Sequence, residues 1–344
     1  MRLPALALFA VLAGLLLIPQ TATAEVKWPK RLTIVCGASG TTVHTIVTAI
    51  AKCIERNTPV ERVIVQPMGG PLIWAPMMEE GELDLAVHNG PDAMDVIRGI
   101  GPYAEMGAKP FIRSLVAGTN YNFLFHTTPK TGIRTFADLK GRTVYTRLPG
   151  NPMFDNMLAA CLGAVGLKES DLKASMTMPN VREATTGLIE GRIDAFLYPP
   201  VPSATLEINQ AAGECVFISP SDEEAKAIIA ALPRGFFVTN IPANSEEIRN
   251  ISPVRNAPSF RNVLYARADM DPELVYGIVK AIIDNRASWE NVHPQARPWG
   301  TIYSTAPAYH EGAIRYYKEK GMWDAETAAN HAENLKIAES MAKK

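Results

Sequence analysis

Short apolar runs alternate with segments of helical periodicity from Arg31 onward. The runs are apolar throughout rather than at every second position, which is typical of strands that are covered on both faces. Segments such as 41–56 and 153–165 instead repeat apolar side chains at helical spacing. This alternation predicts an α/β fold with mainly parallel sheets. The predicted strands are residues 32–36, 60–66, 83–88, 115–117, 143–146, 174–178, 193–197 and 216–219.

A six-residue pattern occurs twice, as EGELDL at 80–85 and as EGRIDA at 190–195, so that the copies lie 110 positions apart. A single copy would indicate only a helix end followed by a strand, because glycine readily closes a last helical turn. The same offset relates Gly40 to Gly150, and each of these glycines lies between an apolar run and a helix-like segment. We therefore expect two lobes of similar plan with a ligand between them.

Two extended segments, 121–125 and 236–239, are candidate crossovers between these lobes. Two crossovers would form a hinge, and a ligand in the cleft would favour the closed form. The sequence thus predicts a first lobe beginning with residues 25–120, a second lobe over 121–236 and a return to the first lobe over 237–305. Amphipathic helices in 306–344 are expected to pack on the outside.

The first residues have the features of a cleavable signal peptide. Arg2 precedes an apolar run from Leu6 to Ile18, and Ala22-Thr23-Ala24 supplies a small-x-small cleavage site. The run is too short for a comfortable membrane span, and no later apolar stretch reaches the length of one. We expect residues 1–24 to be removed near Ala24 and the mature chain to be periplasmic.

Composition narrows the choice of partners. The chain has 34 basic and 35 acidic residues and a formal net charge of −1, with no basic run, which argues against nucleic acid or an anionic membrane. Four cysteines permit disulfides outside the cytoplasm. Only Cys161 with Cys215 is left open as a pair, and buried free thiols are the favoured alternative.

No pattern of a catalytic or metal site is present in the sequence. It contains no G-x-S-x-G, no H-E-x-x-H and no glycine loop followed by Lys-Ser/Thr, and its six histidines are scattered. No Cys/His set has the spacing of a zinc site. We therefore predict a binding protein with no catalytic residue, metal or cofactor; an enzyme is the less favoured alternative.

Several motifs in order carry a family resemblance. They are Leu32-Thr33-Ile34 with Gly37, Ser39 and Gly40, Gln66 with Gly69-Gly70, residues 81–86, Gly132-Ile133, residues 136–142, Pro149-Gly150, and residues 316–321. Together they resemble the TAXI family, the extracytoplasmic solute receptors of one class of tripartite ATP-independent periplasmic (TRAP) transporters. The resemblance covers nearly the whole mature chain.

This resemblance implies a two-lobed, type II-like periplasmic-binding fold. Such a receptor would hold a small organic anion or amino acid between its lobes and deliver it to a membrane permease, and we expect it to be a monomer. The same fold could instead serve an ABC permease or a sensor kinase, and the sequence does not separate these clients.

The chain departs from the TAXI pattern where the ligand would lie. Thr41-Thr42-Val43-His44 replaces the usual glycine and tyrosine pair, and Asn89-Gly90 replaces a Gln-Ser. Trp74 stands where an asparagine is common, and Gly150-Asn151-Pro152-Met153 replaces Gly-Ser-Gly-Thr. Both a glutamate-like or dicarboxylate ligand and an apolar or aromatic carboxylate therefore stay open.

Loops that follow parallel strands lie at the carboxyl edge of a sheet, where open α/β folds bind ligands. The segments 37–42 and 150–153 each precede a predicted helix, whose free N–H groups favour a carboxylate. Arg147 could form a bidentate pair with that carboxylate, or alternatively with a surface acid. The predicted ligand-binding residues are Ser39, Gly40, Thr41, Thr42, His44, Gly69, Gly70, Trp74, His88, Asn89, Arg147, Gly150, Asn151, Met153 and Tyr198.

Overall fold

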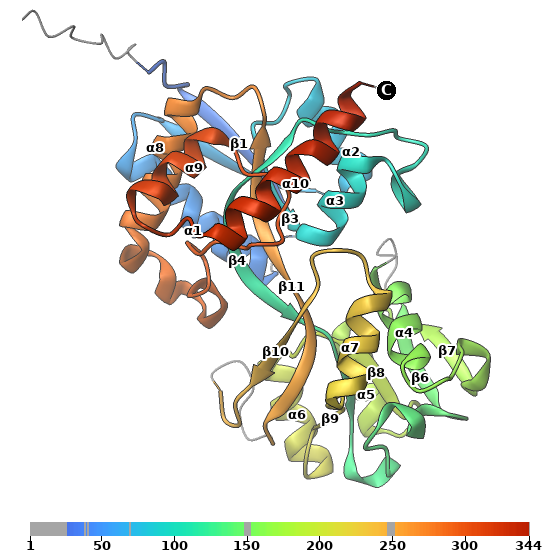
Figure 1. The fold of residues 1–344 in the computed structure, drawn as a ribbon. Coiled ribbons are helices and arrows are strands. Elements are labelled where there is room, and N and C mark those ends of the chain that lie inside the picture. The colour runs from blue at the N-terminus through green and yellow to red at the C-terminus, as the bar shows by residue number, and fades with distance from the viewer. Residues whose placement is uncertain are drawn as a thin grey trace, which may run out of the picture.

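The computed structural model describes residues 26–343 apart from 38, 40, 69, 148–152 and 246–251, and these residues form two lobes (Figure 1). Each lobe is a β-sheet with helices packed against it. This confirms the predicted two-lobed α/β fold. The predicted signal peptide lies outside the described residues. Within the described ranges, no helix combines the length and apolarity that a bilayer crossing requires.

The first sheet has the order β10-β11-β3-β1-β2, with β4 also paired to β11. Its strands are β1 (Arg31–Cys36), β2 (Arg62–Pro67), β3 (Leu85–Asn89), β4 (Ile112–Asn122), β10 (Phe237–Ile241) and β11 (Val254–Arg267). The helices of this lobe are α1 (Thr42–Asn57), α2 (Pro71–Glu79), α3 (Gly90–Arg98), α8 (Pro272–Asp284), α9 (Glu311–Glu319) and α10 (Ala325–Ala342).

The second sheet has the order β7-β6-β8-β5-β9. Its strands are β5 (Leu124–Thr127), β6 (Thr143–Arg147), β7 (Ala174–Thr177), β8 (Ala195–Tyr198) and β9 (Val216–Phe217). The helices are α4 (Met153–Gly163), α5 (Val181–Ile189), α6 (Pro202–Ala212) and α7 (Asp222–Ala231). Helices α4 and α7 pack together, as do α5 and α6.

Both sheets are mixed, which corrects the expectation of mainly parallel sheets. In the first sheet β1 pairs in parallel with β2 and β3, but β11 is antiparallel to β3, β4 and β10. In the second sheet β6 is parallel to β7 and β8, and β5 is antiparallel to β8 and β9. The antiparallel pairs arise because the chain must leave the first lobe and return to it, so the two crossing strands run in opposite directions.

The hinge consists of two long antiparallel strands. β4 enters the second lobe, where β5 follows it directly, and β11 leads back. The pairing of β4 with β11 extends from Asn122 opposite Ser259 to Ile112 opposite Arg267. β11 pairs with β10 through its first half and with β3 through its second half. Residues 236–239 are thus the beginning of a strand beside β11, and β11 itself spans the lobes.

The repeated sequence pattern occupies equivalent places in the two lobes. The glycine of each copy follows the end of α2 or α5 and has a positive φ, 79° and 73°. The aspartate of each copy accepts a backbone N–H from the neighbouring strand, Asp84 Oδ2 from Thr33 at 2.7 Å and Asp194 Oδ2 from Thr143 at 2.8 Å. These partners also lie 110 positions apart. The pattern therefore connects each helix end to the sheet of its own lobe.

A short segment of the first lobe is fixed against the hinge strand β4. The ring of Trp299 lies so close to Gly118 that a Cβ there would come within 2.0 Å of it. Trp299 Nε1 donates a hydrogen bond to Thr119 Oγ1 at 2.8 Å, and this hydroxyl donates to the Gln295 carbonyl at 3.0 Å. These contacts hold the 3-10 helix η7 (Pro294–Ala296) over the hinge.

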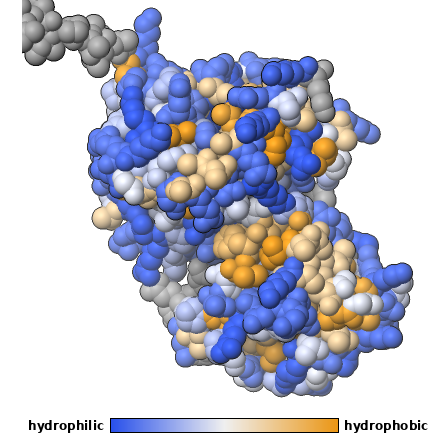
Figure 2. Space-filling view, in the orientation of Figure 1, coloured by the Kyte–Doolittle hydropathy of each residue, from blue (hydrophilic) through white to orange (hydrophobic). Residues whose placement is uncertain are grey.

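The lobes also touch beside the hinge. The guanidinium of Arg234, which follows α7, donates to Glu333 and Asn330 of α10. A Cβ at the neighbouring Gly235 would lie 3.3 Å from Pro91 of α3. Figure 2 shows a largely polar face with apolar residues gathered where the lobes meet. An ion pair and a close backbone approach thus join the lobes outside the two strands.

All four cysteines are buried and free, including Cys161 and Cys215. Cys161 belongs to the core between the second sheet and α4, whereas Cys215 packs in a separate cluster of that lobe. Burial raises the pKa of the Cys215 thiol to about 12, so the thiol stays protonated at neutral pH. This arrangement agrees with the favoured alternative of buried thiols.

His126 should make the protein sensitive to mild acid. Its ring is 1% exposed and stacks on Phe196 at 4.3 Å, and burial lowers its pKa to about 3. In the unfolded chain this histidine titrates near pH 6.5. The stability gained by burying the neutral ring is therefore fully present above that pH and is lost as the pH falls toward 3. Between pH 7 and pH 5 the loss is about 2 kcal/mol. Urea unfolding at pH 7 and pH 5 should show that the free energy of unfolding decreases less in His126→Phe than in the wild type. An equal decrease in both proteins would show that His126 is not the cause of the acid sensitivity.

Candidate functional site

A cavity of about 530 Å³ opens between the lobes, where β1 and β8 end. We call it the cleft cavity. Its volume lies within the range of small-molecule sites. The residues that line it come from both lobes and from the hinge: Thr41, Thr42, Tyr121, Val181, Tyr198, Pro199, Pro200, Val201, Pro202, Ser203, Leu206, His293, Pro294 and Gln295.

Three helices begin at the cleft cavity. Thr42 starts α1, Val181 starts α5 and Pro202 starts α6, and each of these residues lines the cavity. The first N–H groups of a helix lack intrahelical partners and carry the positive end of its dipole. Their convergence gives the cavity a positive potential without any basic side chain.

The helix α6 differs from the other two in its capping. The hydroxyl of Thr41 accepts from the His44 N–H at 3.2 Å in α1, and Asn180 Oδ1 accepts from the Glu183 N–H at 2.9 Å in α5. The N-cap residue of α6 is Val201, which has no side-chain acceptor, and the first intrahelical bond is donated by Thr205. Because Pro202 has no N–H, the free donors in the first turn of α6 are the N–H groups of Ser203 and Ala204, which could meet an anion.

Neutral hydrogen-bond donors surround this helix end. Burial raises the pKa values of Tyr121 and Tyr198, so both phenols keep their protons at neutral pH. Burial also lowers the pKa of His293, and its Nδ1 accepts the Gln295 backbone N–H at 3.1 Å. The proton of the neutral imidazole is therefore on Nε2, which can donate to a ligand.

The rest of the lining is apolar. Prolines, valines and Leu206, which is 44% exposed, form most of the wall of the second lobe. Among the described lining residues none carries a formal charge at neutral pH. The cavity therefore offers one anion-binding end and an apolar body, without a second ionic contact.

Three of the predicted ligand-binding residues line this cavity: Thr41, Thr42 and Tyr198. Four others, Gly40, Gly69, Gly150 and Asn151, lie outside the described residues. Ser39 and Gly70 are exposed at the beginnings of α1 and α2, and His44 is half-buried in the first turn of α1. These three do not line the cleft cavity.

His88, Asn89 and Trp74 lie together in the first lobe. Asn89 caps α3 by accepting the Asp92 N–H at 2.7 Å, and its Nδ2 donates to Asp92 Oδ2 at 2.8 Å. His88 Nε2 lies 2.9 Å from the same carboxylate oxygen, which helps to lower the pKa of Asp92 despite its burial. Trp74 is 2% exposed and packs edge-on against His88 in the core. The tryptophan is thus a core side chain rather than a cavity wall.

Arg147 and Met153 also have partners away from the cleft cavity. Arg147 Nε donates to Asp155 at 3.0 Å, and Nη2 donates to Glu169. These are exposed ion pairs, which is the alternative that the sequence left open for this arginine. Met153 is 2% exposed in the core of the second lobe.

Replacing Arg147 with alanine should leave ligand affinity within about twofold and lower stability by less than about 1 kcal/mol, because exposed ion pairs contribute little. Calorimetric titration and urea unfolding of the variant would measure both quantities. A dissociation constant raised by tenfold or more would show that Arg147 does contact the ligand.

Several lining residues were missed by sequence reasoning. Pro199 to Pro202 follow β8 at the position that the 110-residue offset pairs with the junction of β3 and α3, so the repeat could have identified them. Tyr121 lies in the predicted crossover without any pattern of its own. His293 to Gln295 reach the cavity only because η7 packs on β4, and no local pattern predicts that contact.

No group of His, Cys, Asp and Glu that could hold a metal ion occurs among the described residues. The groups around the cleft cavity can bind and orient a ligand through hydrogen bonds and apolar contact.

Comparison with known proteins gives a family and a fold. The sequence matches the NMT1-like family over residues 34–321. No curated protein matches the sequence. PhnD1 of Prochlorococcus marinus, solved with methylphosphonate, is 10% identical, with a TM-score of 0.50 over 85% of this chain and 99% of its own. XAC2383 of Xanthomonas citri, solved with ATP, is 10% identical, with a TM-score of 0.50 over 92% and 99%.

A third similar structure is described as the periplasmic sulfonate-binding protein of a sulfonate ABC transporter from Methylobacillus flagellatus. It is 13% identical, with a TM-score of 0.46 over 89% of this chain and 95% of its own. At such identities the two structures with a TM-score of 0.50 show only that the fold is similar.

Proposed function

The chain belongs to the NMT1-like family, and from this premise and the geometry of the cleft cavity we propose that it is an extracytoplasmic solute-binding protein. It closes its two lobes on a small organic anion and presents the closed complex to a membrane permease. The protein binds its ligand without changing it.

The start of α6 at the cleft cavity carries this proposal. Its first turn has no side-chain cap, and Pro202 and Ser203 of this turn line a space that both lobes share. A carboxylate, phosphonate or sulfonate oxygen can accept from the free N–H groups of this turn, and the helix dipole favours its charge. Contacts from both lobes to one ligand stabilise the closed form over the open one.

The lining favours a ligand with one anionic group and an apolar or aromatic body. Tyr121 and Tyr198 provide ring faces, and the prolines and Leu206 provide aliphatic surface. A dicarboxylate would bury a second charge with no ionic partner among the described lining residues, and such burial is costly. Of the two ligand classes that the sequence left open, the apolar or aromatic acid therefore fits better.

The permease class is the next part of the proposal. The resemblance to TAXI receptors implied a TRAP permease, with an ABC permease as the alternative. We favour the ABC permease, which accords with the sulfonate ABC transporter protein among the similar structures. Uptake into membrane vesicles carrying the cognate permease would distinguish them: an ABC system requires ATP, whereas a TRAP system does not.

The cellular setting follows from the same proposal. Residues 1–24 act as a cleavable signal peptide, the mature chain works in the periplasm as a monomer, and its lobes follow the predicted division of the chain. The order of lobes along the sequence agrees with the sheets, since strands β5 to β9 form one sheet and the flanking strands form the other.

A thermal-shift screen of the mature protein tests the proposal. A ligand that binds only the folded state at about 100 times its dissociation constant adds about 2.7 kcal/mol of stability. Aromatic and apolar monocarboxylates, sulfonates and phosphonates should raise the melting temperature more than dicarboxylates of similar size. Stabilisation by a nonionic sugar, with none from any of these acids, would refute an anion-binding cleft.

A further inference from the structure

A buried amide of the hinge strand β11 has no hydrogen-bond partner among the described residues. It is the Nδ2 group of Asn262, whose side chain belongs to a residue that is only 6% exposed. Leaving a buried donor unpaired is costly, and buried polar groups of folded proteins nearly always have a partner. The amide therefore contributes no hydrogen bond to the fold, which points to a partner outside the chain.

Asn262 projects from the face of the hinge that borders the cleft cavity. Tyr121, which lines this cavity, lies opposite Phe260 of β11 and stacks on its ring with centroids 5.3 Å apart. Side chains two positions apart on a strand share a face and are separated by about 7 Å. Asn262 thus follows Phe260 on the same face, toward the first lobe.

The alternation along β11 is regular at this point. Its pairing with β3 continues without a shift from Asn262 to Ala266. The irregularity in its pairing with β4 lies between Arg261 opposite Asn120 and Val263 opposite Ala117, so the extra residue belongs to β4. The face assigned to Asn262 therefore does not depend on a bulge in its own strand.

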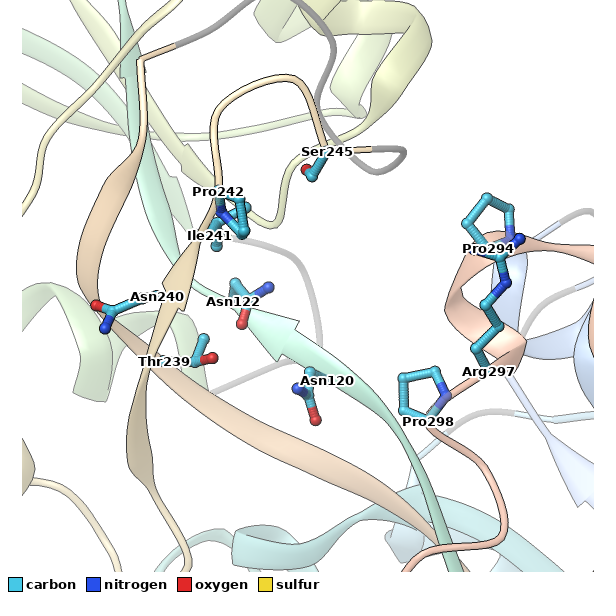
Figure 3. A pocket seen from close by; sticks show the side chains of 10 residues that line it. All are labelled: Asn120, Asn122, Thr239, Asn240, Ile241, Pro242, Ser245, Pro294, Arg297 and Pro298. Carbon is cyan, nitrogen blue, oxygen red and sulfur yellow. The ribbon is translucent and has the colours of Figure 1, made fainter.

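The opposite face of the hinge carries a different cavity, of about 340 Å³, between β4 and β10 on one side and residues 294–298 on the other (Figure 3). Asn120 and Asn122 of β4 line it, and each is already bonded within the hinge. Asn120 Oδ1 accepts from Arg261 Nε at 3.0 Å, and Asn122 Oδ1 accepts from Ser259 Oγ at 2.7 Å. These two asparagines join the hinge strands, a role that Asn262 does not share.

The other buried side-chain atoms without a partner in the described part of the chain belong to different places in the first lobe. They lie in Tyr265, Tyr303, Thr305, His310 and Asn334. Tyr265 is three positions from Asn262 along β11 and so projects from the opposite face. The remaining four follow the hinge strands in the sequence, in the segment 303–310 and in α10.

The position of Asn262 beside the strand ends of the first lobe is that of a binding residue. It lies opposite Asn89, the last residue of β3. The neighbouring strand β1 leads to Thr41 and Thr42, which line the cleft cavity. The carboxyl ends of parallel strands are where open α/β folds bind ligands. The amide is therefore on the first-lobe side of the cleft, whereas the start of α6 belongs to the second lobe.

We propose that Asn262 is a ligand-binding residue, which donates a hydrogen bond to an oxygen atom of the bound solute from the first lobe. This inference rests on the proposed solute-binding function. A half-turn of the amide about its Cβ–Cγ bond exchanges Nδ2 with Oδ1, so the N–H groups can turn toward the solute. A solute held by Asn262 on one side and by α6 on the other bridges the lobes and stabilises the closed form.

Asn262→Leu, which keeps a similar volume and removes the amide, should change stability and affinity independently. The ligand-free variant loses no internal hydrogen bond and no longer buries an unpaired donor, so its melting temperature should be unchanged or higher. Its dissociation constant should rise by about tenfold or more. Calorimetric titration of the mature protein measures this with whichever of phenylacetate, benzenesulfonate, phenylphosphonate and glucose most raises the wild-type melting temperature. Asn262→Ala, which adds no bulk, should show the same loss of affinity.

Asn334→Leu is the matched control. Asn334 is a buried asparagine of the same lobe, 1% exposed, whose Nδ2 donates to the Ala306 carbonyl at 2.6 Å. Its replacement should lower the melting temperature and leave the dissociation constant within about twofold, because distant sites act independently. A lowered melting temperature with wild-type affinity in Asn262→Leu would overturn the proposal, since the amide would then serve the fold. Glucose as the best binder, with a tenfold loss in Asn262→Leu, would refute the anion-binding function and still support Asn262 as a binding residue.

Discussion

Gly118→Ala is expected to destabilise the protein by about 3 kcal/mol or more, since overpacking a close contact is costly. The added methyl would lie within 2.0 Å of the Trp299 ring, which is fully buried and held by its bond to Thr119. The φ angle of Gly118 is not in the left-handed region, so the effect is steric rather than conformational. Urea unfolding of the variant measures it.

The same change should weaken ligand binding. Displacing Trp299 moves η7, and with it the part of the cleft cavity that His293 and Gln295 supply. Gly163→Ala is the matched control, because a Cβ at this exposed helix position meets no atom within 4 Å and should be neutral or slightly stabilising. In a Trp299→Ala background the cost of Gly118→Ala should fall sharply. An equal cost in both backgrounds would show that the ring is not the obstacle.

Ser203→Glu is expected to reduce ligand affinity by tenfold or more without lowering stability. Ser203 is exposed in the first turn of α6 and lines the cleft cavity. A carboxylate there interacts favourably with the helix dipole, by about 0.3–1 kcal/mol, so the fold should be unaffected or slightly stabilised. It also occupies the N–H groups proposed for the ligand and repels the ligand's charge.

The neutral isostere Ser203→Gln separates charge from size and should change affinity by less than about threefold. Both variants are titrated with the acid that most stabilises the wild type in the thermal-shift screen. Equal losses in the two variants would mean that bulk rather than charge is responsible. Unchanged ligand affinity in Ser203→Glu would show that the ligand does not bind at the start of α6.

The strands and helices follow closely from local patterns. The predicted helix over 41–56 is observed as Thr42–Asn57, and the predicted strand over 143–146 as Thr143–Arg147. Apolar runs and the glycines that end them determine these elements. Apolar side chains can be buried together only if their spacing along the chain matches the period of a helix or a strand. Strand direction was less predictable: β11 has an apolar run like the others, yet it is antiparallel to every neighbour.

The candidate site was predictable to the extent that it uses the ends of regular elements. Thr41 and Thr42 lie after β1 and Tyr198 ends β8, and the rule that ligands meet the carboxyl edge of a sheet selected these residues, which line the cleft cavity. Arg147 occupies a similar position but is paired with Asp155 and Glu169, which come from a helix and a later turn. Such pairings depend on packing between distant segments and leave no local signal.

The sequence by itself determined that this protein has two lobes of one plan, because the repeated pattern specifies a helix end followed by a strand in each. It also determined where helices begin beside those strands, since caps and periodicity are local. Only the tertiary structure decided which helix end faces the cavity without a cap, and that Tyr121 and η7 complete the lining. Those contacts join residues far apart in the chain, and their energies depend on how β4, β11 and Trp299 pack together.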